Sequence, residues 1–133
     1  MKTADDIESY LLKTGLPYEQ VKPGIWVLNV EGCENFVVSI AGPVVVFRVK
    51  VMDVPAGNRE GLYRTLLTLN TSDMVHGAFG LEGDKVVIVH ALELENLDLN
   101  EFQGVIDDVS IAIARHYPVL SRWHEMGASP SPA

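Results

Sequence analysis

The sequence has little of several features that would point to particular functions. It contains a single cysteine, Cys33, so no intramolecular disulfide can form. Its 10 basic residues are outnumbered by 18 acidic ones, which gives a formal net charge of −8. A field of that sign repels a phosphate backbone, and no basic stripe offsets it. We therefore expect no nucleic-acid partner.

Long apolar runs are missing as well. The longest, "VVVF" at 44–47 with its neighbours, is far shorter than the ~20 residues that a bilayer-spanning helix needs. Residues 1–13 carry acidic side chains where a signal peptide has an uninterrupted apolar segment. We expect a cytoplasmic protein without a membrane partner.

Signatures of catalysis and of cofactor binding are sparse. No serine has a GxSxG setting, no CxxC pair occurs, and no two histidines stand four residues apart on a predicted helix. Cys33 lies between Glu31 and Glu34, whose charges would raise the pKa of a thiol and make it less reactive. The sequence therefore predicts no catalytic residue, no metal site and no cofactor.

The chain does contain enough apolar material for one core. Nearly half of its 133 residues are hydrophobic, and a chain of this length suits one compact domain. We expect a single domain over residues 1–126. The last residues, 127–133, read "GASPSPA" and are expected to form a flexible tail.

Three segments have the apolar spacing of amphipathic helices. They cover residues 3–15, 59–70 and 98–118. Thr3 is a suitable cap for the first helix, and Gly15 is suited to end it. Asp98 and Glu101 form a capping-box pair at the start of the third, and Pro118 is expected to end or kink it.

Five further segments have the composition of β-strands. They cover residues 25–31, 35–41, 44–52, 74–82 and 85–93. The short connections between consecutive strands require antiparallel neighbours, because parallel pairing needs a long crossover. Residues 16–24 are interpreted as a connector. The element order α-β-β-β-α-β-β-α predicts an α+β domain with helices packed against an antiparallel sheet.

The stretch "HGAFGLEGDKVVIVHALELE", residues 76–95, allows an interpretation as a phosphate loop or a metal site. A phosphate-binding glycine loop precedes a helix, whereas Gly83 and Asp84 here turn one strand into the next. His76 and His90 could approach each other across that hairpin. This keeps open a small-ligand or metal-dependent enzyme as a hypothesis from another class.

Apolar residues exceed what one packing face of the second helix needs. Leu62, Leu66 and Leu69 share one side of residues 59–70, and Tyr63 and Leu67 lie on a neighbouring side. A helix that packs on one sheet needs only one apolar stripe. The additional apolar surface indicates a second partner, such as another protomer.

Several of these segments together resemble a known family. "LYRTLLTLN", "GAFGLEGDKVVIVHALEL" and "LDLNEFQGVIDDV" are similar to segments of the type III secretion chaperone-like superfamily, which includes Tir-chaperone (CesT-like) proteins and YbjN-type domains. The matching positions are Leu62, Leu66, Leu69 and Asn70, then Phe79 to Leu81, the turn Glu82 to Asp84, and the strand from Val86. The resemblance extends over about residues 3 to 117.

The resemblance implies a small acidic cytoplasmic protein, usually a homodimer, that has no catalytic residues and holds an extended client segment. By position, the implied dimer contacts are Leu62, Leu66 and Leu69. The implied client-binding residues are Leu11, Leu12, Leu16, Trp26 and Leu28. A YbjN-like regulatory or adaptor domain that binds one folded partner is the alternative.

Overall fold

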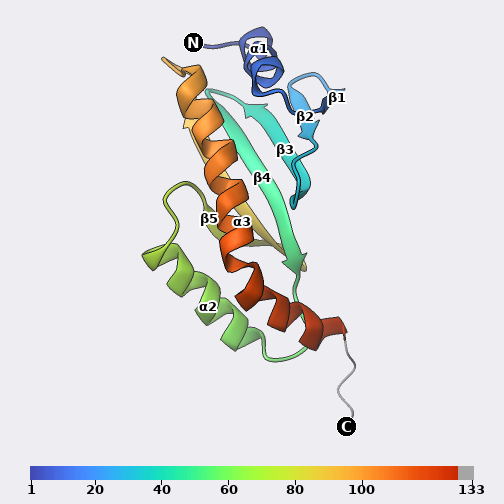
Figure 1. Ribbon diagram of the computed structural model, residues 1–133. Helices are drawn as coiled ribbons and strands as arrows, with labels where there is room; N and C mark the ends of the chain where they lie inside the picture. The colour runs from blue at the N-terminus through green and yellow to red at the C-terminus, as the bar shows by residue number, and fades with distance from the viewer. Residues whose placement is uncertain (129–133) are drawn as a thin grey trace.

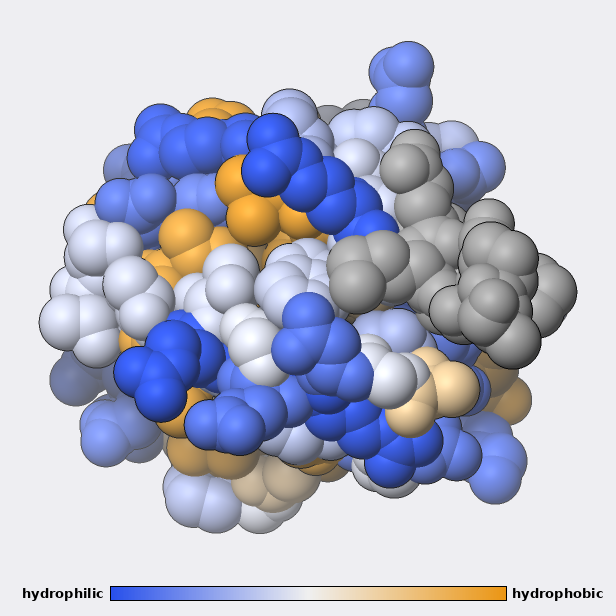
Figure 2. Space-filling view, turned by 90° about the horizontal axis from the view of Figure 1, so that it is seen from below, coloured by the Kyte–Doolittle hydropathy of each residue, from blue (hydrophilic) through white to orange (hydrophobic). Residues whose placement is uncertain are grey.

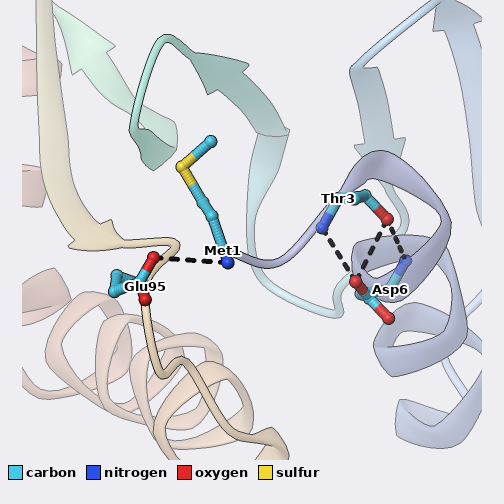
Figure 3. Close-up of polar contacts among 4 residues, drawn as sticks. All are labelled: Met1, Thr3, Asp6 and Glu95. Atoms are coloured by element: carbon cyan, nitrogen blue, oxygen red, sulfur yellow. Dashed lines mark hydrogen bonds and ion pairs between the residues drawn. The ribbon is translucent and has the colours of Figure 1, made fainter.

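Polar groups at the N-terminus start the first helix. In the computed structural model, which describes residues 1–128 of the chain, α1 spans Ala4–Thr14 (Figure 1). The Thr3 N–H donates to the Asp6 carboxylate at 2.8 Å, and the Asp6 N–H donates to the Thr3 hydroxyl (Figure 3). This capping box lowers the pKa of Asp6, chiefly through the Thr3 backbone hydrogen bond. The Met1 amino group lies 3.3 Å from the Glu95 carboxylate, which attaches the N-terminus to a distant loop.

Six strands form one antiparallel sheet, one more than the sequence pattern predicts. They are β1 (Tyr18–Lys22), β2 (Ile25–Leu28), β3 (Glu34–Ala41), β4 (Val44–Asp53), β5 (Ala78–Glu82) and β6 (Lys85–Glu93), in the spatial order β1-β2-β3-β4-β6-β5. The extra strand, β1, lies in the segment interpreted as a connector. Four of its five residues are exposed, so it has no buried alternating pattern to reveal it. The predicted α+β class with an antiparallel sheet is confirmed.

The helices cover one face of this sheet. The two others are α2 (Arg59–Ser72) and α3 (Leu99–Ala128). Helix α3 crosses β4 and β6 with α1 packed beside it, and α2 lies against β5 (Figure 1). Phe102 of α3 stands at the centre of the core, with its ring 5.3 Å from that of Phe47 and 5.6 Å from that of Tyr10. No helix of the described residues is both long and apolar enough to cross a membrane.

The opposite face of the sheet carries mostly β-branched side chains. Ile25, Val27, Val37 and Val46 alternate along their strands with the fully buried residues of the core, and each is half-buried by its neighbours. Within residues 1–128, no helix covers this face. The apolar residues on both faces of the strands therefore belong to a sheet with one layer of helices.

Of the two outcomes expected at Pro118, an end or a kink, the structure has the kink, and α3 continues to Ala128 (Figure 1). The expected capping box is present, since the Glu101 N–H donates to the Asp98 carboxylate at 2.8 Å. Pro118 lies inside the helix, which changes direction in its C-terminal part (Figure 1). Gly127 and Ala128, assigned to the tail by the sequence analysis, are the last residues of α3. The rest of the expected tail, 129–133, lies outside the described residues.

The two glycines inside helices have different environments. A Cβ at Gly61 of α2 would stand 2.7 Å from the outer edge of the Trp123 ring, so a larger residue there requires that ring to move. A Cβ at Gly104 of α3 would meet no described atom within 4 Å. Gly61 is therefore closely packed against Trp123, and nothing in the structure explains Gly104.

Candidate functional site

The outer edge of β1 is open. Among residues 1–128, no strand lies beyond β1 in the sheet. The Asn29 N–H of the chain after β2 donates to the Pro17 carbonyl at 2.9 Å, so Pro17 and Asn29 are a hydrogen-bonded pair. Hydrogen-bonded and non-hydrogen-bonded pairs alternate along an antiparallel ladder. Tyr18 and Gln20 therefore occupy non-bonded positions. Their backbone N–H and C=O groups point away from β2, where an added strand could pair with them.

The opposite edge of the sheet, β5, is blocked at Phe79 by a side chain. The Phe79 N–H donates to the Asn70 amide oxygen at 2.7 Å, and the Asn70 amide nitrogen donates to the Phe79 carbonyl at 3.1 Å. Asn70 lies on α2, which packs along β5. The amide occupies the donor and the acceptor that an incoming strand would use. The outward groups of Phe79 on β5 are therefore taken, whereas no described residue pairs with those of Tyr18 and Gln20 on β1.

A groove adjoins the open edge. It has a volume of about 400 Å³ and lies where β1 meets the end of β2 and the following loop. Its lining residues come from β1, β2 and the loop that leads to β3: Pro17, Tyr18, Glu19, Val27, Leu28, Asn29, Cys33 and Asn35. The side chain of Val21 on β1 is exposed as well. Apolar surface and unpaired backbone groups thus lie close together at this corner.

The five residues that the resemblance implies for client binding lie in different environments. Leu11 and Trp26 are buried in the core. Leu28 is also buried but lines the groove, and Leu16 is half-buried. Leu12 on α1 is 67% exposed. Sequence reasoning missed β1 itself, whose open edge was not recognisable in a segment that contains two prolines.

The three leucines implied for dimer contact lie on the inner side of α2. Leu62 is fully buried, Leu66 is 5% exposed and Leu69 is half-buried against the core. In the single chain, Leu62 and Leu66 therefore expose almost no surface. The outward apolar residues are Leu67, which is 66% exposed, and the half-buried Tyr63.

The outer face of α2 is of mixed character. It has a shallow depression lined by Glu60, Tyr63, Arg64, Leu67, Thr68 and Thr71. Figure 2 views the molecule from the end where α2 and the C-terminal part of α3 lie, and apolar areas there are separated by hydrophilic side chains. A contact on this face would bury charged and hydroxyl groups along with Tyr63 and Leu67.

His76 and His90 meet at the start of the β5–β6 hairpin, as the sequence analysis suggested. Their rings stand 5.4 Å apart. The His76 ring is hydrogen-bonded to the Asp108 carboxylate of α3, and the Gly77 N–H donates to His90 Nδ1 at 2.9 Å. Strand β5 begins only at Ala78, four residues later than predicted, because the preceding residues form this bonded loop. The two histidines thus fasten the loop to α3 and β6.

A third histidine lies on the other side of the same loop. His116 of α3 is buried, and its Nε2 lies 3.9 Å from the Asp73 carboxylate without a hydrogen-bond partner among the described residues. Within the part of the chain that the structure describes, no group of three or more His, Cys, Asp or Glu side chains is arranged to hold a metal ion. The observed role of these side chains is to hold the α2–β5 connection in place.

The Cys33 thiol lies beside the groove near β1. Burial raises the pKa of Cys33, and a weak contact with the Ser110 hydroxyl at 3.9 Å partly opposes that rise. The direction agrees with the sequence analysis, although the cause is burial rather than the neighbouring glutamates. A thiol with a raised pKa is mostly protonated at neutral pH and is a poor nucleophile.

His90 should make stability depend on pH. Burial, with a smaller contribution from nearby His76, lowers the pKa of His90 in the folded chain. The unfolded chain therefore binds this proton at a higher pH, near the ordinary histidine pKa of about 6.5. The neutral His90 ring therefore contributes to the free energy of unfolding above that pH. This contribution is lost as the pH falls toward the lower pKa of His90 in the folded chain. Urea unfolding at pH 7.5 and 5.5 should show this loss in the wild type.

The matched variant is His90→Asn, which has no titrating group but keeps an acceptor at the position of Nδ1 for the Gly77 N–H. Because other groups titrate in the same range, the quantity to compare is the change in unfolding free energy between the two pH values. We expect a smaller change in His90→Asn than in the wild type. An identical change in both proteins would contradict the assignment.

Comparisons with known proteins address the fold and the family. The family model CesT_Tir_1 matches residues 1–126. No curated protein sequence matches the chain significantly. Solved structures with a similar fold include a chain of the heterodimeric complex ExoU–SpcU from the type III secretion system of Pseudomonas aeruginosa. That chain is 18% identical, with a TM-score of 0.68 over 84% of this chain and 95% of the other.

Two further structures are similar in fold. YbjN from E. coli, described as a putative transcription regulator, has a TM-score of 0.68 at 15% identity, over 90% of this chain and 94% of the other. A chain of the HopA1–SchA chaperone–effector complex has a TM-score of 0.61 at 9% identity, over 88% of each chain. At these identities the structural likeness establishes the fold alone. The family follows from the model that matches 126 of the 133 residues: the chain belongs to the CesT_Tir_1 family.

Proposed function

We propose that this chain is a non-enzymatic, dimeric protein-binding module of the cytoplasm that holds an extended apolar segment of a client polypeptide. The client segment pairs with the outer edge of β1 and places apolar side chains in the adjoining groove. The observation that carries this proposal is the difference between the sheet edges. Tyr18 and Gln20 present free backbone groups, whereas Asn70 blocks β5 at Phe79.

The side chains around β1 favour an apolar client. Leu12 and Val21 are exposed, and Leu28 and Val27 line the groove. Burying this surface gives affinity that depends little on the exact client sequence, since the hydrophobic effect is not directional. The chaperone–effector complex among the similar structures supports a polypeptide client.

Dimerisation is proposed to use the outer face of α2. Tyr63 and Leu67 supply apolar surface, and Glu60 and Arg64 lie on the same depression. In a twofold contact the same patch meets itself, so Glu60 of one protomer can approach Arg64 of the other. This contact leaves β1 free, because β1 and α2 lie at opposite sides of the molecule (Figure 1).

The test of strand addition is Gln20→Pro. Proline removes the outward N–H of Gln20 but keeps the bonds to β2, and edge strands tolerate it on the side that faces solvent. The probe is a fluorescein-labelled neutral peptide, Ser-Val-Thr-Leu-Thr-Val-Ser, titrated by fluorescence anisotropy. We expect at least a tenfold loss of affinity together with an unchanged thermal unfolding midpoint.

The matched control is Gln20→Thr, which removes the same side chain but keeps the N–H. Its affinity for the peptide should stay within about twofold of the wild type. If proline and threonine at this position bind the peptide equally well, the client does not pair with β1 and the proposal fails.

An adaptor that binds one folded partner is the second candidate. The observation that favours it is the uncovered sheet face, where the half-buried Ile25, Val27, Val37 and Val46 lie among the polar Ser39 and Arg48. Such a mixed surface is suited to a folded partner. The similarity in fold to YbjN agrees with such a role. Under this alternative, Val37→Lys abolishes partner binding and Gln20→Pro does not. Under strand addition, Gln20→Pro abolishes binding and Val37→Lys does not.

A further inference from the structure

Strand β4 is longer than the strand beside it. The last residue pair between β3 and β4 is Glu34 with Lys50. Beyond that pair β4 continues to Asp53 and is bonded only to β6, through Met52 and Asp53. On the side of β3, no strand in the described part of the chain faces residues 51–53. This leaves a second, short free edge, separate from the outer edge of β1.

A cavity of about 260 Å³ lies beside this short edge. Its walls come from β4, from the start of β3 and from α3 on both sides of Pro118: Gly32, Glu34, Lys50, Val51, Met52, Asp53, Ile113, Tyr117, Leu120 and Ser121. The α3 wall is apolar, because Ile113 and Leu120 pack on the core and the exposed Tyr117 stands beside them. Pockets for drug-sized ligands are roughly 300–1,000 Å³, so this cavity suits one bulky side chain.

The rim of the cavity keeps an uncompensated negative charge. Lys50 Nζ lies 3.3 Å from the Asp53 carboxylate and 3.7 Å from the Glu34 carboxylate. The Lys50 side chain is 18% exposed, whereas both carboxylates are more than half exposed. One ammonium group balances only one of the two carboxylates. The remaining charge faces solvent at the mouth of the cavity.

We infer that this groove is a second peptide-binding site, for an extended segment in which a bulky apolar residue stands next to lysine or arginine. The segment pairs with β4 at 51–53, its apolar side chain enters the cavity between Tyr117 and Leu120, and its basic side chain binds Glu34 and Asp53. The inference goes beyond client binding at β1, because this site is formed by the edge of β4 and by α3. It also requires a basic side chain in the bound segment.

The charge at the rim indicates which kind of segment occupies this groove. Residues 127–133, "GASPSPA", contain no basic side chain and no bulky apolar one. A second copy carries the same charge of −8, so the long-range field does not draw it to this acidic rim, and its proposed contact through α2 lies elsewhere. A basic segment of another protein is attracted by that field and is complementary to the rim. The occupant is therefore a basic, apolar segment of a different protein.

The test uses two labelled peptides, Lys-Val-Leu-Val-Lys and Glu-Val-Leu-Val-Glu, titrated into the full chain by fluorescence anisotropy. We expect only the basic peptide to bind. Ser121→Trp, which places an indole in the cavity from the α3 wall, should weaken its binding at least tenfold. Asp53→Lys, which reverses the charge at the rim, should have an effect of the same size.

The matched control is Glu93→Lys, which makes the same change in net charge at an exposed position opposite Val44, at the other end of β4. It should bind the basic peptide within about twofold of the wild type. An equal loss in Glu93→Lys and Asp53→Lys would overturn the inference, because binding would then follow net charge alone. So would unchanged binding in a folded Ser121→Trp variant. If Ser121→Trp does not fold, the comparison of the two charge variants decides.

The two binding sites can be tested separately. Gln20→Pro should leave binding of the basic peptide unchanged, and Asp53→Lys should leave binding of the neutral peptide unchanged. Loss of the basic peptide in Gln20→Pro would place it at β1 and refute the second site. If the neutral peptide does not bind at all, the proposed client function is contradicted. The second site at β4 is then judged by the basic peptide alone.

Discussion

Replacing Leu66 with aspartate is expected to unfold the chain, whereas the same replacement at the adjacent Leu67 leaves it folded. Leu66 is 5% exposed and belongs to the core, so the variant loses apolar burial and places a charge without a partner inside the protein. Loss of a buried leucine alone costs about 2–5 kcal/mol, and the buried charge adds to that cost. A domain is stable by roughly 5–15 kcal/mol in total, so little or no stability remains.

Leu67 tests the dimer instead of the core. Its side chain is 66% exposed on the outer face of α2, and surface substitutions usually change stability by less than about 0.5 kcal/mol. Circular dichroism should therefore show folded Leu67→Asp and unfolded Leu66→Asp. Light scattering should show that Leu67→Asp halves the mass of a wild-type dimer. A dimer that persists in Leu67→Asp, or a wild-type monomer, would refute the contact through α2.

Replacing Asn70 with alanine is expected to destabilise the chain and to make it self-associate. The variant leaves the Phe79 N–H and C=O without their partner, and Phe79 is buried. Each buried polar group left unpaired costs about 1–3 kcal/mol. The outer edge of β5 also becomes available to other strands. Urea unfolding should show the lower stability, and light scattering should show mass rising with protein concentration.

The nearby Ser72→Ala variant is the control for Asn70→Ala. Ser72 is exposed, does not line the depression on α2, and its hydroxyl only donates to the Thr68 carbonyl within the same helix. Alanine has a higher helix propensity than serine, so stability should stay the same or rise slightly. If Asn70→Ala is as stable as Ser72→Ala and stays at one mass, the amide does not protect the edge.

Local sequence patterns predicted the helices well, because their signals come from residues close together in the chain. Thr3 and Gly15 bound α1, and Asp98 with Glu101 starts α3, as expected. Each motif requires only the hydrogen bonds of one helical turn. Pro118 was expected to mark the end of α3 or a kink, and only packing decides that the helix continues through it. Leu120 is buried beyond the proline, which supports the last turns.

The candidate sites were less predictable, because they depend on where separate segments meet. The leucines of α2 were recognised as a set, but the sequence could not tell which of them face the core. A helix of this composition has apolar residues on several sides, and the position of β5 and α3 decides that Leu66 is buried and Leu67 exposed. Asn70 was recognised only through the resemblance to a known family. Its hydrogen bonds to Phe79 could not be predicted, because they depend on how α2 packs against β5.

The sequence alone determined the α+β class, the antiparallel pairing, the acidic charge and the absence of a catalytic signature. These depend on composition, periodicity and loop length, which are local properties. The tertiary structure decided which strand edge is open, which is blocked by Asn70, and where β4 extends beyond β3. An edge is free or covered only in relation to other segments of the chain, so no pattern within one segment can reveal it.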